Sequence, residues 1–302
     1  KNDRLAVSLW QPYDLRVDRL HKIFLNKLMV TDLKGRNWKE PLPQPRATSR
    51  EQELAQARNS PSVLDALPND PHHILVVNNV GSDAGDVYKV DLRDYSAERI
   101  QMSEPSVAGY VTDLEGVLRA RLKQGIDGTG AYISAEFRNL QTGRWEEHFR
   151  SHVKDRDQTA IIGFSKDPGI AFIASNQGQD KTAIYEYDAS SRQRKEVLFQ
   201  HRFFNADRVL INPYRASGEA FGEILGLGYE GPRGDDVEWT FPALSALDAG
   251  LRQALAIASV PVKLVDPATG QSAMVEYPAE KDLSILDYTP DFKTVLVSVD
   301  GA

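Results

Sequence analysis

The stretch Tyr185-Glu-Tyr-Asp-Ala-Ser-Ser191 contains the unit that decides the fold, which is an apolar strand, an acidic residue, a short turn and a second, more polar strand. The same unit recurs at Leu28-Met-Val-Thr-Asp-Leu-Lys-Gly35, Tyr88-Lys-Val-Asp-Leu-Arg-Asp94, Phe137-Arg-Asn-Leu-Gln-Thr-Gly143 and Leu264-Val-Asp-Pro-Ala-Thr-Gly270. An internal repeat of this kind indicates a fold in which each copy forms one supersecondary element.

The acidic or amide residue of each unit marks the register of the repeat. Its side chain can accept a hydrogen bond from the backbone N–H two residues further on, so each unit should close a hairpin turn. Intervals of 59, 48, 49 and 78 residues separate these marks, which are Asp32, Asp91, Asn139, Asp188 and Asp266. Such spacing brackets the length of a four-stranded propeller blade, and the two longer intervals hold insertions.

A second repeated element is a turn rich in Asp and Pro that precedes an apolar run. It occurs at Leu67–Pro71, Phe164–Pro168 and Tyr288–Asp291. Short apolar runs bounded by turn residues and rich in β-branched types favour strands over helices. Together the two elements predict an all-β fold, a β-propeller of six to seven blades, that forms a single domain over residues 1–302.

Two segments break the strand pattern and predict small helical insertions. Residues 48–58 begin with Thr48 and Glu51 at the spacing of a capping box. Residues 243–257 follow Pro242 and carry leucines three and four residues apart, as on the apolar face of a docked helix. We expect both to be structural insertions; a lid or a partner contact is the alternative.

Composition excludes several classes of protein. The chain has 302 residues, of which 41% are hydrophobic, and a net charge of −7. It lacks a block of Lys and Arg that could neutralise phosphates, so nucleic acid is not an expected partner. It also lacks the run of about 18 apolar residues that a membrane span requires. There is no cysteine, which fits the periplasm and the cytoplasm equally.

Several stretches resemble the propeller of the prolyl oligopeptidase family of serine peptidases, in its bacterial members related to acylaminoacyl peptidases. The similar stretches, in order, are residues 68–77 with 87–91, residues 164–175 with 183–188, and residues 219–229 followed by the predicted helix. Each strand motif alone is shared by many propellers, whereas the order with a late helix is more particular. The region after Asp266 is less similar to the family.

The resemblance implies a domain without catalytic residues, cofactor or metal of its own. In that family the propeller covers a C-terminal α/β-hydrolase domain, narrows access to the active site and contributes to the selection of peptide substrates. The expected partners are therefore such a hydrolase domain in the parent chain and a peptide substrate. A parent gene that continues past Ala302 into a hydrolase would support this hypothesis.

The residues themselves offer no strong candidate for chemistry. A hydrolase needs Ser within Gly-x-Ser-x-Gly, and the nearest stretch, Gly163-Phe-Ser-Lys-Asp167, has Asp at the second glycine position and lies in a predicted turn. No His-Glu-x-x-His zinc motif occurs. We expect packing or surface roles for the six histidines, which are His21, His72, His73, His148, His152 and His201.

Acidic and glycine-rich segments also favour turns over sites. Residues 83–86 and 234–237 lack the ligand spacing of an EF-hand loop, so we expect hairpin tips. Residues 125–130 lack the Lys and Ser or Thr of a phosphate-binding loop. Two further hypotheses stay open beside the peptidase propeller. One is a free-standing propeller that binds a protein or peptide, and the other is an autonomous propeller enzyme such as a metal-dependent lactonase or a glycosidase.

Overall fold

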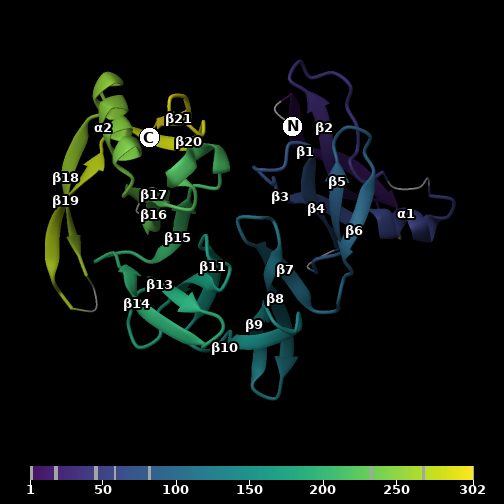
Figure 1. Ribbon diagram of the computed structural model, residues 1–302, viewed down its shortest axis with the longest axis horizontal. Helices are drawn as coiled ribbons and strands as arrows, with labels where there is room; N and C mark the ends of the chain where they lie inside the picture. Colours follow the sequence, from purple (N-terminus) through teal and green to yellow (C-terminus); the bar gives the residue numbers. More distant parts are fainter. Residues whose placement is uncertain are drawn as a thin grey trace. The chain divides into compact units, whose positions relative to one another are not determined.

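The computed structural model describes residues 3–16, 20–43, 47–57, 59–80, 83–231, 234–266 and 269–301. The chain forms two compact units, of which the first comprises Lys1–Arg138 with Trp145–Glu147, and the second comprises Asn139–Arg144 with His148–Ala302. Antiparallel strands dominate both units (Figure 1). The prediction of an all-β protein is therefore confirmed, while the single domain over the whole chain stays a prediction.

Three sheets have the form of a propeller blade, four antiparallel strands in which each strand pairs with its neighbour in sequence. The first contains β3 (Asn59–Asp65), β4 (His73–Val80), β5 (Val87–Asp91) and β6 (Ala97–Gln101). The second contains β7 (Val107–Thr112), β8 (Leu118–Asp127), β9 (Gly130–Arg138) and β10 (Trp145–His152). The third contains β11 (Thr159–Phe164), β12 (Ile170–Ser175), β13 (Ala183–Asp188) and β14 (Gln193–Phe199).

A fourth blade has three strands, β15 (Ala206–Ile211), β16 (Ile224–Gly231) and β17 (Gly234–Trp239), with a 3-10 helix η1 at Arg215–Ala220. The remaining sheets are hairpins of two strands, namely β1 (Arg4–Arg16) with β2 (Leu20–Asp32), β18 (Ser259–Val265) with β19 (Ser272–Pro278), and β20 (Lys281–Tyr288) with β21 (Val295–Gly301). The three four-stranded sheets and the three-stranded sheet make four propeller-type blades among the described residues. The predicted count of six to seven blades stays a prediction.

Central strands of the blades are buried on both faces, which their continuous apolar sequences require. In β4, Ile74 and Val76 pack into one apolar cluster with Leu28 and Val30 of β2. The alternate residues Leu75 and Val77 pack into a second cluster with residues of the β7–β8 region. Successive side chains of a strand point to opposite faces of its sheet. One short sequence thereby supplies two cores within the first unit.

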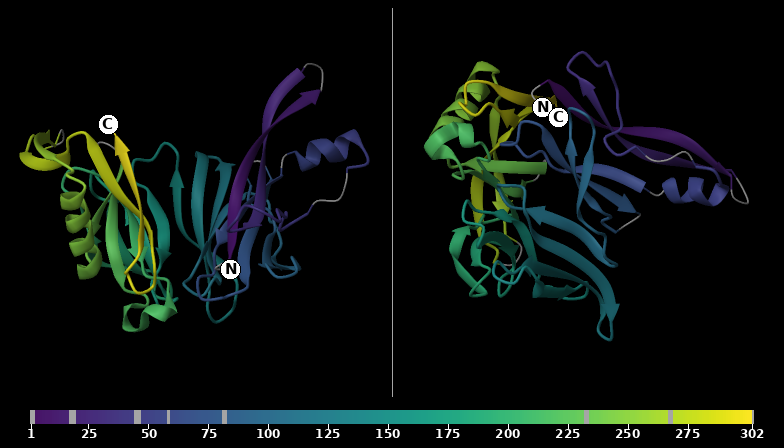
Figure 2. Two further views of the ribbon diagram at one scale, coloured as in Figure 1. Left: turned by 90° about the horizontal axis from the view of Figure 1, so that it is seen from above. Right: turned by 45° about the vertical axis from the view of Figure 1, so that its right-hand side comes forward.

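The hairpin of β1 and β2 extends from the first unit as a long ribbon, as the purple strands of Figure 2 show. Its two strands pair from Arg4↔Asp32 to Arg16↔Leu20. The middle of the ribbon is fixed to the first blade, where the Asn26 side chain donates a hydrogen bond of 2.9 Å to Ser60.

Both predicted helices are present. Helix α1 covers Arg50–Gln56, but its cap differs from the predicted pair of Thr48 and Glu51. Ser49 Oγ accepts the backbone N–H of Gln52 at 3.2 Å, and Gln52 Oε1 accepts the N–H of Thr48 at 2.9 Å. The side-chain cap therefore lies at Ser49, one residue later than predicted, and the return bond from Gln52 goes to the residue before it.

Helix α2 covers Pro242–Ala254 with proline in its first turn, as predicted. Leu244 is fully buried, whereas the leucines of the following turns are partly exposed. The helix ends before the predicted residue 257, since Ala256 adopts a positive φ of 50°. It contacts β17 and β20 within the second unit.

Candidate functional site

The repeated acidic residues form the hairpin turns that the sequence predicted. Asp32, Asp91 and Asp188 each accept backbone N–H bonds from residues two or more positions later, at 2.8–3.0 Å, and Asn139 does so with its side-chain oxygen. Gly35, Gly143 and Gly270 have φ between 68° and 69°, the left-handed conformation that glycine adopts without strain. Part of the last turn, residues 267 and 268, lies outside the described residues.

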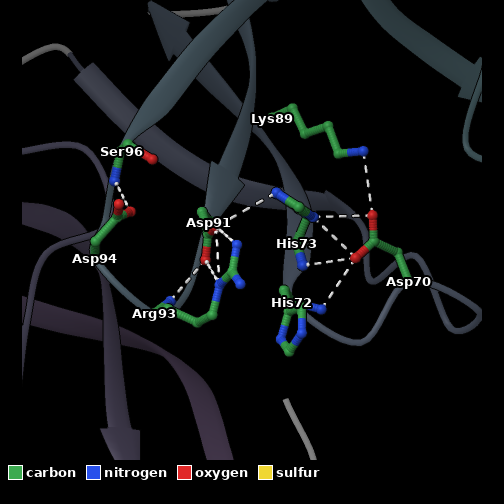
Figure 3. Close-up of polar contacts among 8 residues, drawn as sticks. All are labelled: Asp70, His72, His73, Lys89, Asp91, Arg93, Asp94 and Ser96. Atoms are coloured by element: carbon green, nitrogen blue, oxygen red, sulfur yellow. Dashed lines mark hydrogen bonds and ion pairs between the residues drawn. The ribbon is translucent and has the colours of Figure 1, made fainter.

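One of these turns belongs to a dense polar cluster in the first blade, shown in Figure 3. The ring of His73 lies between two carboxylates, with Nδ1 2.9 Å from Asp70 and Nε2 3.6 Å from Asp91. Lys89 reaches Asp70 at 3.1 Å, and the guanidinium of Arg93 reaches Asp91 at 2.6 Å. We call these five residues the His73 cluster.

The carboxylates of the His73 cluster are stabilised in their ionised form. Partial burial opposes the ionisation of Asp70, but hydrogen bonds from the His72 N–H, the His73 ring and Lys89 hold its pKa well below the usual value. The Arg93 side chain and its backbone N–H lower the pKa of Asp91 in the same way. Both carboxylates therefore have strong donors and belong to turns, so the arrangement favours a structural role.

The second polar region is a cavity of about 810 Å³ in the second unit. Its lining comes from separate elements, among them β15, β17, α2, β20 and β21. Five aspartates and two arginines contribute to the lining, which gives it an excess of negative charge. We call this region the acidic cavity; its aspartates are Asp235, Asp236, Asp248, Asp282 and Asp300.

Arg252 of α2 organises one wall of the acidic cavity. Its Nε donates to Asp248 one turn earlier at 2.9 Å, its Nη1 donates to Asp282 at 3.1 Å, and its Nη2 donates to the carbonyl of Leu283 at 3.0 Å. Burial opposes its charge, yet the carboxylates of Asp248 and Asp282 raise its pKa. The guanidinium thereby ties α2 to β20 and neutralises part of the acidic lining.

Asp236 differs from the other carboxylates, since it accepts no hydrogen bond and forms no ion pair with the residues that the structure describes. Burial raises its pKa, and the negative charge of Asp282 raises it further. From β15, on the far side of β16, Arg208 donates to Asp235 at 3.0 Å, while its Nε has no hydrogen-bond partner among the described residues. The cavity thus contains a carboxylate that receives no hydrogen bond from the residues that the structure describes.

The serine weighed as a nucleophile is a turn residue. Ser165 Oγ donates to the carbonyl of Asp167 at 3.0 Å and accepts the backbone N–H of the same residue. Gly163 precedes it in β11. The turn interpretation is confirmed.

The histidines pack against neighbours, as expected. His148 and His152 lie on β10, where the ring of the first contacts the Tyr187 hydroxyl at 3.0 Å and that of the second lies 3.4 Å from Asp155. His201 stacks on Tyr229 with ring centroids 4.3 Å apart, and burial lowers the pKa of its imidazole. The side chain of His21 lies outside the described residues.

The acidic and glycine-rich segments divide into confirmed turns and one correction. Within residues 125–130, only Gly128 and Thr129 form the turn between β8 and β9, and the Thr129 N–H bonds Asp127 at 2.8 Å; the residues on either side belong to the two strands. Asp83 forms an isolated antiparallel bridge with Val80. Asp235 and Asp236, predicted at a hairpin tip, instead belong to β17, because the ladder between β16 and β17 continues through Gly231↔Gly234. That placement turns Asp236 toward the acidic cavity.

Sequence reasoning did not identify the acidic cavity. Its charged residues are spread over positions 208 to 300 and share no motif, so only the folded chain brings them together. Within the described ranges, no three His, Asp or Glu residues are placed to hold a metal ion. No helix in this part of the chain is long and apolar enough to cross a membrane.

The blades define the class of the protein, which is an all-β protein of the propeller type. No protein family model matches this chain. The dipeptidyl aminopeptidase BIII of Pseudoxanthomonas mexicana is 26% identical over 172 residues, which are 57% of this chain and 23% of that protein. The predicted resemblance to the prolyl oligopeptidase family is confirmed, and the similarity covers less than a quarter of the relative's length.

The solved structures of several proteins with different activities are weakly similar to this chain. The dipeptidyl peptidase 4 of Porphyromonas gingivalis has a TM-score of 0.40 and 11% identity, covering 91% of this chain and 40% of that chain. An oligogalacturonate lyase in complex with manganese has a TM-score of 0.42 and 8% identity, covering 96% of this chain and 77% of that chain. One of these proteins is a peptidase and the other is a lyase, so the structural similarity does not indicate which activity this chain is associated with.

Proposed function

We propose that this chain is the non-catalytic propeller of a serine peptidase, which gates and selects peptide substrates for a C-terminal α/β-hydrolase domain. The similarity to a dipeptidyl aminopeptidase over 172 residues carries the proposal. The blades support it, since they match the expected scaffold. The coding sequence after residue 302 tests it: a Gly-x-Ser-x-Gly segment followed by Asp and His supports the proposal, and a stop codon there contradicts it in favour of a free-standing binding propeller.

The acidic cavity is the region we expect to contact the peptide. An aminopeptidase substrate carries a protonated amino end, and a lining of five aspartates and two arginines favours a cation. Asp236 supports this role, because its carboxylate accepts no hydrogen bond from the described residues and is free to accept one from an ammonium group. Binding of a cation would offset the cost of keeping this half-buried carboxylate ionised.

Peptide binding to the chain of residues 1–302 tests the role of the cavity. Short peptides with a free amino end should bind more tightly than their N-acetylated forms, and calorimetry measures both. Asp236→Asn should reduce this preference about tenfold, whereas Glu219→Gln, an exposed carboxylate outside the cavity, should leave it unchanged. Equal affinity for free and acetylated peptides would remove the cavity from the proposal without affecting the family similarity.

A further inference from the structure

Strands β4, β12 and β21 begin with the same turn. Asp70, Asp167 and Asp291 each accept the backbone N–H of the residue two positions later, at 3.0, 2.9 and 3.2 Å. The apolar strand follows at the same distance from each acidic residue, as the repeat in the sequence predicted. These turns therefore align the three strands residue by residue.

The aligned residues have opposite exposure. Leu75 and Phe172, five positions after their turn aspartates, are each 2% exposed. Leu296 occupies the same position in β21 and is 60% exposed. Three positions later, Ser175 of β12 is 1% exposed, but Val299 of β21 is 43% exposed. A sequence suited to a buried central strand thus faces solvent in β21.

The difference follows from strand pairing. Strands β4 and β12 each pair with a neighbour on both sides, whereas β21 pairs only with β20 among the strands that the structure describes. The backbone N–H and C=O groups along its other edge are available for a further strand. An extended segment that adds to such an edge gains backbone hydrogen bonds and covers apolar side chains.

The complete blades specify the missing neighbour. In both, the third strand ends with an aspartate opposite the residue three positions after the turn aspartate, as the pairs His73↔Asp91 and Ile170↔Asp188 show. The corresponding residue before β21 is Thr294. The neighbour of β21 should therefore be an apolar strand that ends in Asp opposite Thr294 and continues through a turn into a fourth strand.

We propose that the free edge of β21 is the docking site for this strand–Asp turn–strand segment, supplied by the same polypeptide beyond residue 302. Every complete blade of this chain draws its four strands from consecutive sequence, which favours that source over a second copy. That the segment comes from the same polypeptide rests on the proposed function. That the edge of β21 can accept a strand follows from the pairing and exposure of β21 alone.

A copy of the chain's own third and fourth strands provides the probe. Residues 176–199, which include β13 and β14, are appended through a short linker to the chain of residues 1–302. Hydrogen exchange of the amides in residues 295–301 is then measured with and without the appended segment. We expect exchange to slow by about tenfold or more, because the edge N–H groups become bonded.

The control carries proline at the appended position that copies Tyr185, which removes a donor from the added strand. Slower exchange with the intact copy alone, with β12 unchanged, supports the proposal. Equal exchange in all three proteins overturns it, as does protection of β21 in the unmodified chain that rises with protein concentration, which would identify a second copy as the occupant. The sequence of the downstream gene tests the peptidase function separately.

Discussion

The His73 cluster and the acidic cavity use the same residue types for opposite purposes. In the cluster, Asp70 and Asp91 are surrounded by donors, and their pKa values fall. In the cavity, Asp236 accepts no hydrogen bond from the described residues, and burial raises its pKa. The first arrangement stabilises ionised carboxylates within the fold. The second leaves a carboxylate without a donor among the described residues, which is why we propose it as a contact for the peptide.

The largest expected difference is in the free energy of unfolding, when one carboxylate is removed from each region. Asp70→Ala leaves the His73 ring, Lys89 and two backbone N–H groups without their acceptor, so we expect a loss of about 1–3 kcal/mol in the free energy of unfolding. Asp236→Ala removes no hydrogen bond to the residues that the structure describes and should change stability by less than about 0.5 kcal/mol. Urea denaturation of both variants measures the difference. Equal losses would contradict the division into structural and functional regions.

The stability that the His73 cluster contributes should be lost at low pH, when its carboxylates are protonated. A carboxylate whose folded pKa is lowered contributes stability above its unfolded pKa, and that contribution is lost as the pH falls through the folded value. For Asp70 and Asp91 the loss begins near the ordinary value of 3.8 and continues below it. We expect the melting temperature to decrease steeply below about pH 4. The double variant Asp70→Asn/Asp91→Asn should start lower and decrease less steeply, and an unchanged slope would contradict this account.

Arg252→Ala should have an intermediate effect. It leaves Asp248 and Asp282 without their guanidinium and separates α2 from β20, which we expect to cost about 1–2 kcal/mol. Loss of the positive charge should also raise the pKa of Asp236 further, because Arg252 is the cation that lowers it. Urea denaturation measures the first effect and carboxyl NMR titration the second. Arg156→Ala, a change of an exposed arginine in the same unit, serves as the matched control.

Asp236→Asn should stabilise the protein slightly. A raised pKa means that ionisation of Asp236 favours the unfolded state, so its contribution is favourable below the unfolded value of 3.8 and is lost as the pH rises through the folded value. The amide should therefore raise the melting temperature by about 1–3 °C at pH 7, and the gain should vanish toward pH 4. A gain that does not depend on pH would exclude the electrostatic explanation.

Local features of the fold were accessible to sequence reasoning, whereas long-range ones were not. The turns at Asp32 and Asp188 follow from hydrogen bonds between residues two or three positions apart, so the sequence contains all of their determinants. The capping box was misplaced by one residue because Thr48 and Ser49 are chemically equivalent candidates. The acidic cavity depends on Arg208, Asp236 and Asp282 meeting in space, and no spacing in the sequence encodes that encounter.

The Asp turns also have a consequence for how the chain folds. Each joins two strands that are adjacent in sequence and caps their connection with its own side chain, so a hairpin can form before any distant segment arrives. Contacts between nearby residues carry little loop-closure entropy and favour rapid formation. Blades assembled from such hairpins can accumulate one after another as the polypeptide leaves the ribosome. Each Asp turn would then close one hairpin at a time during translation.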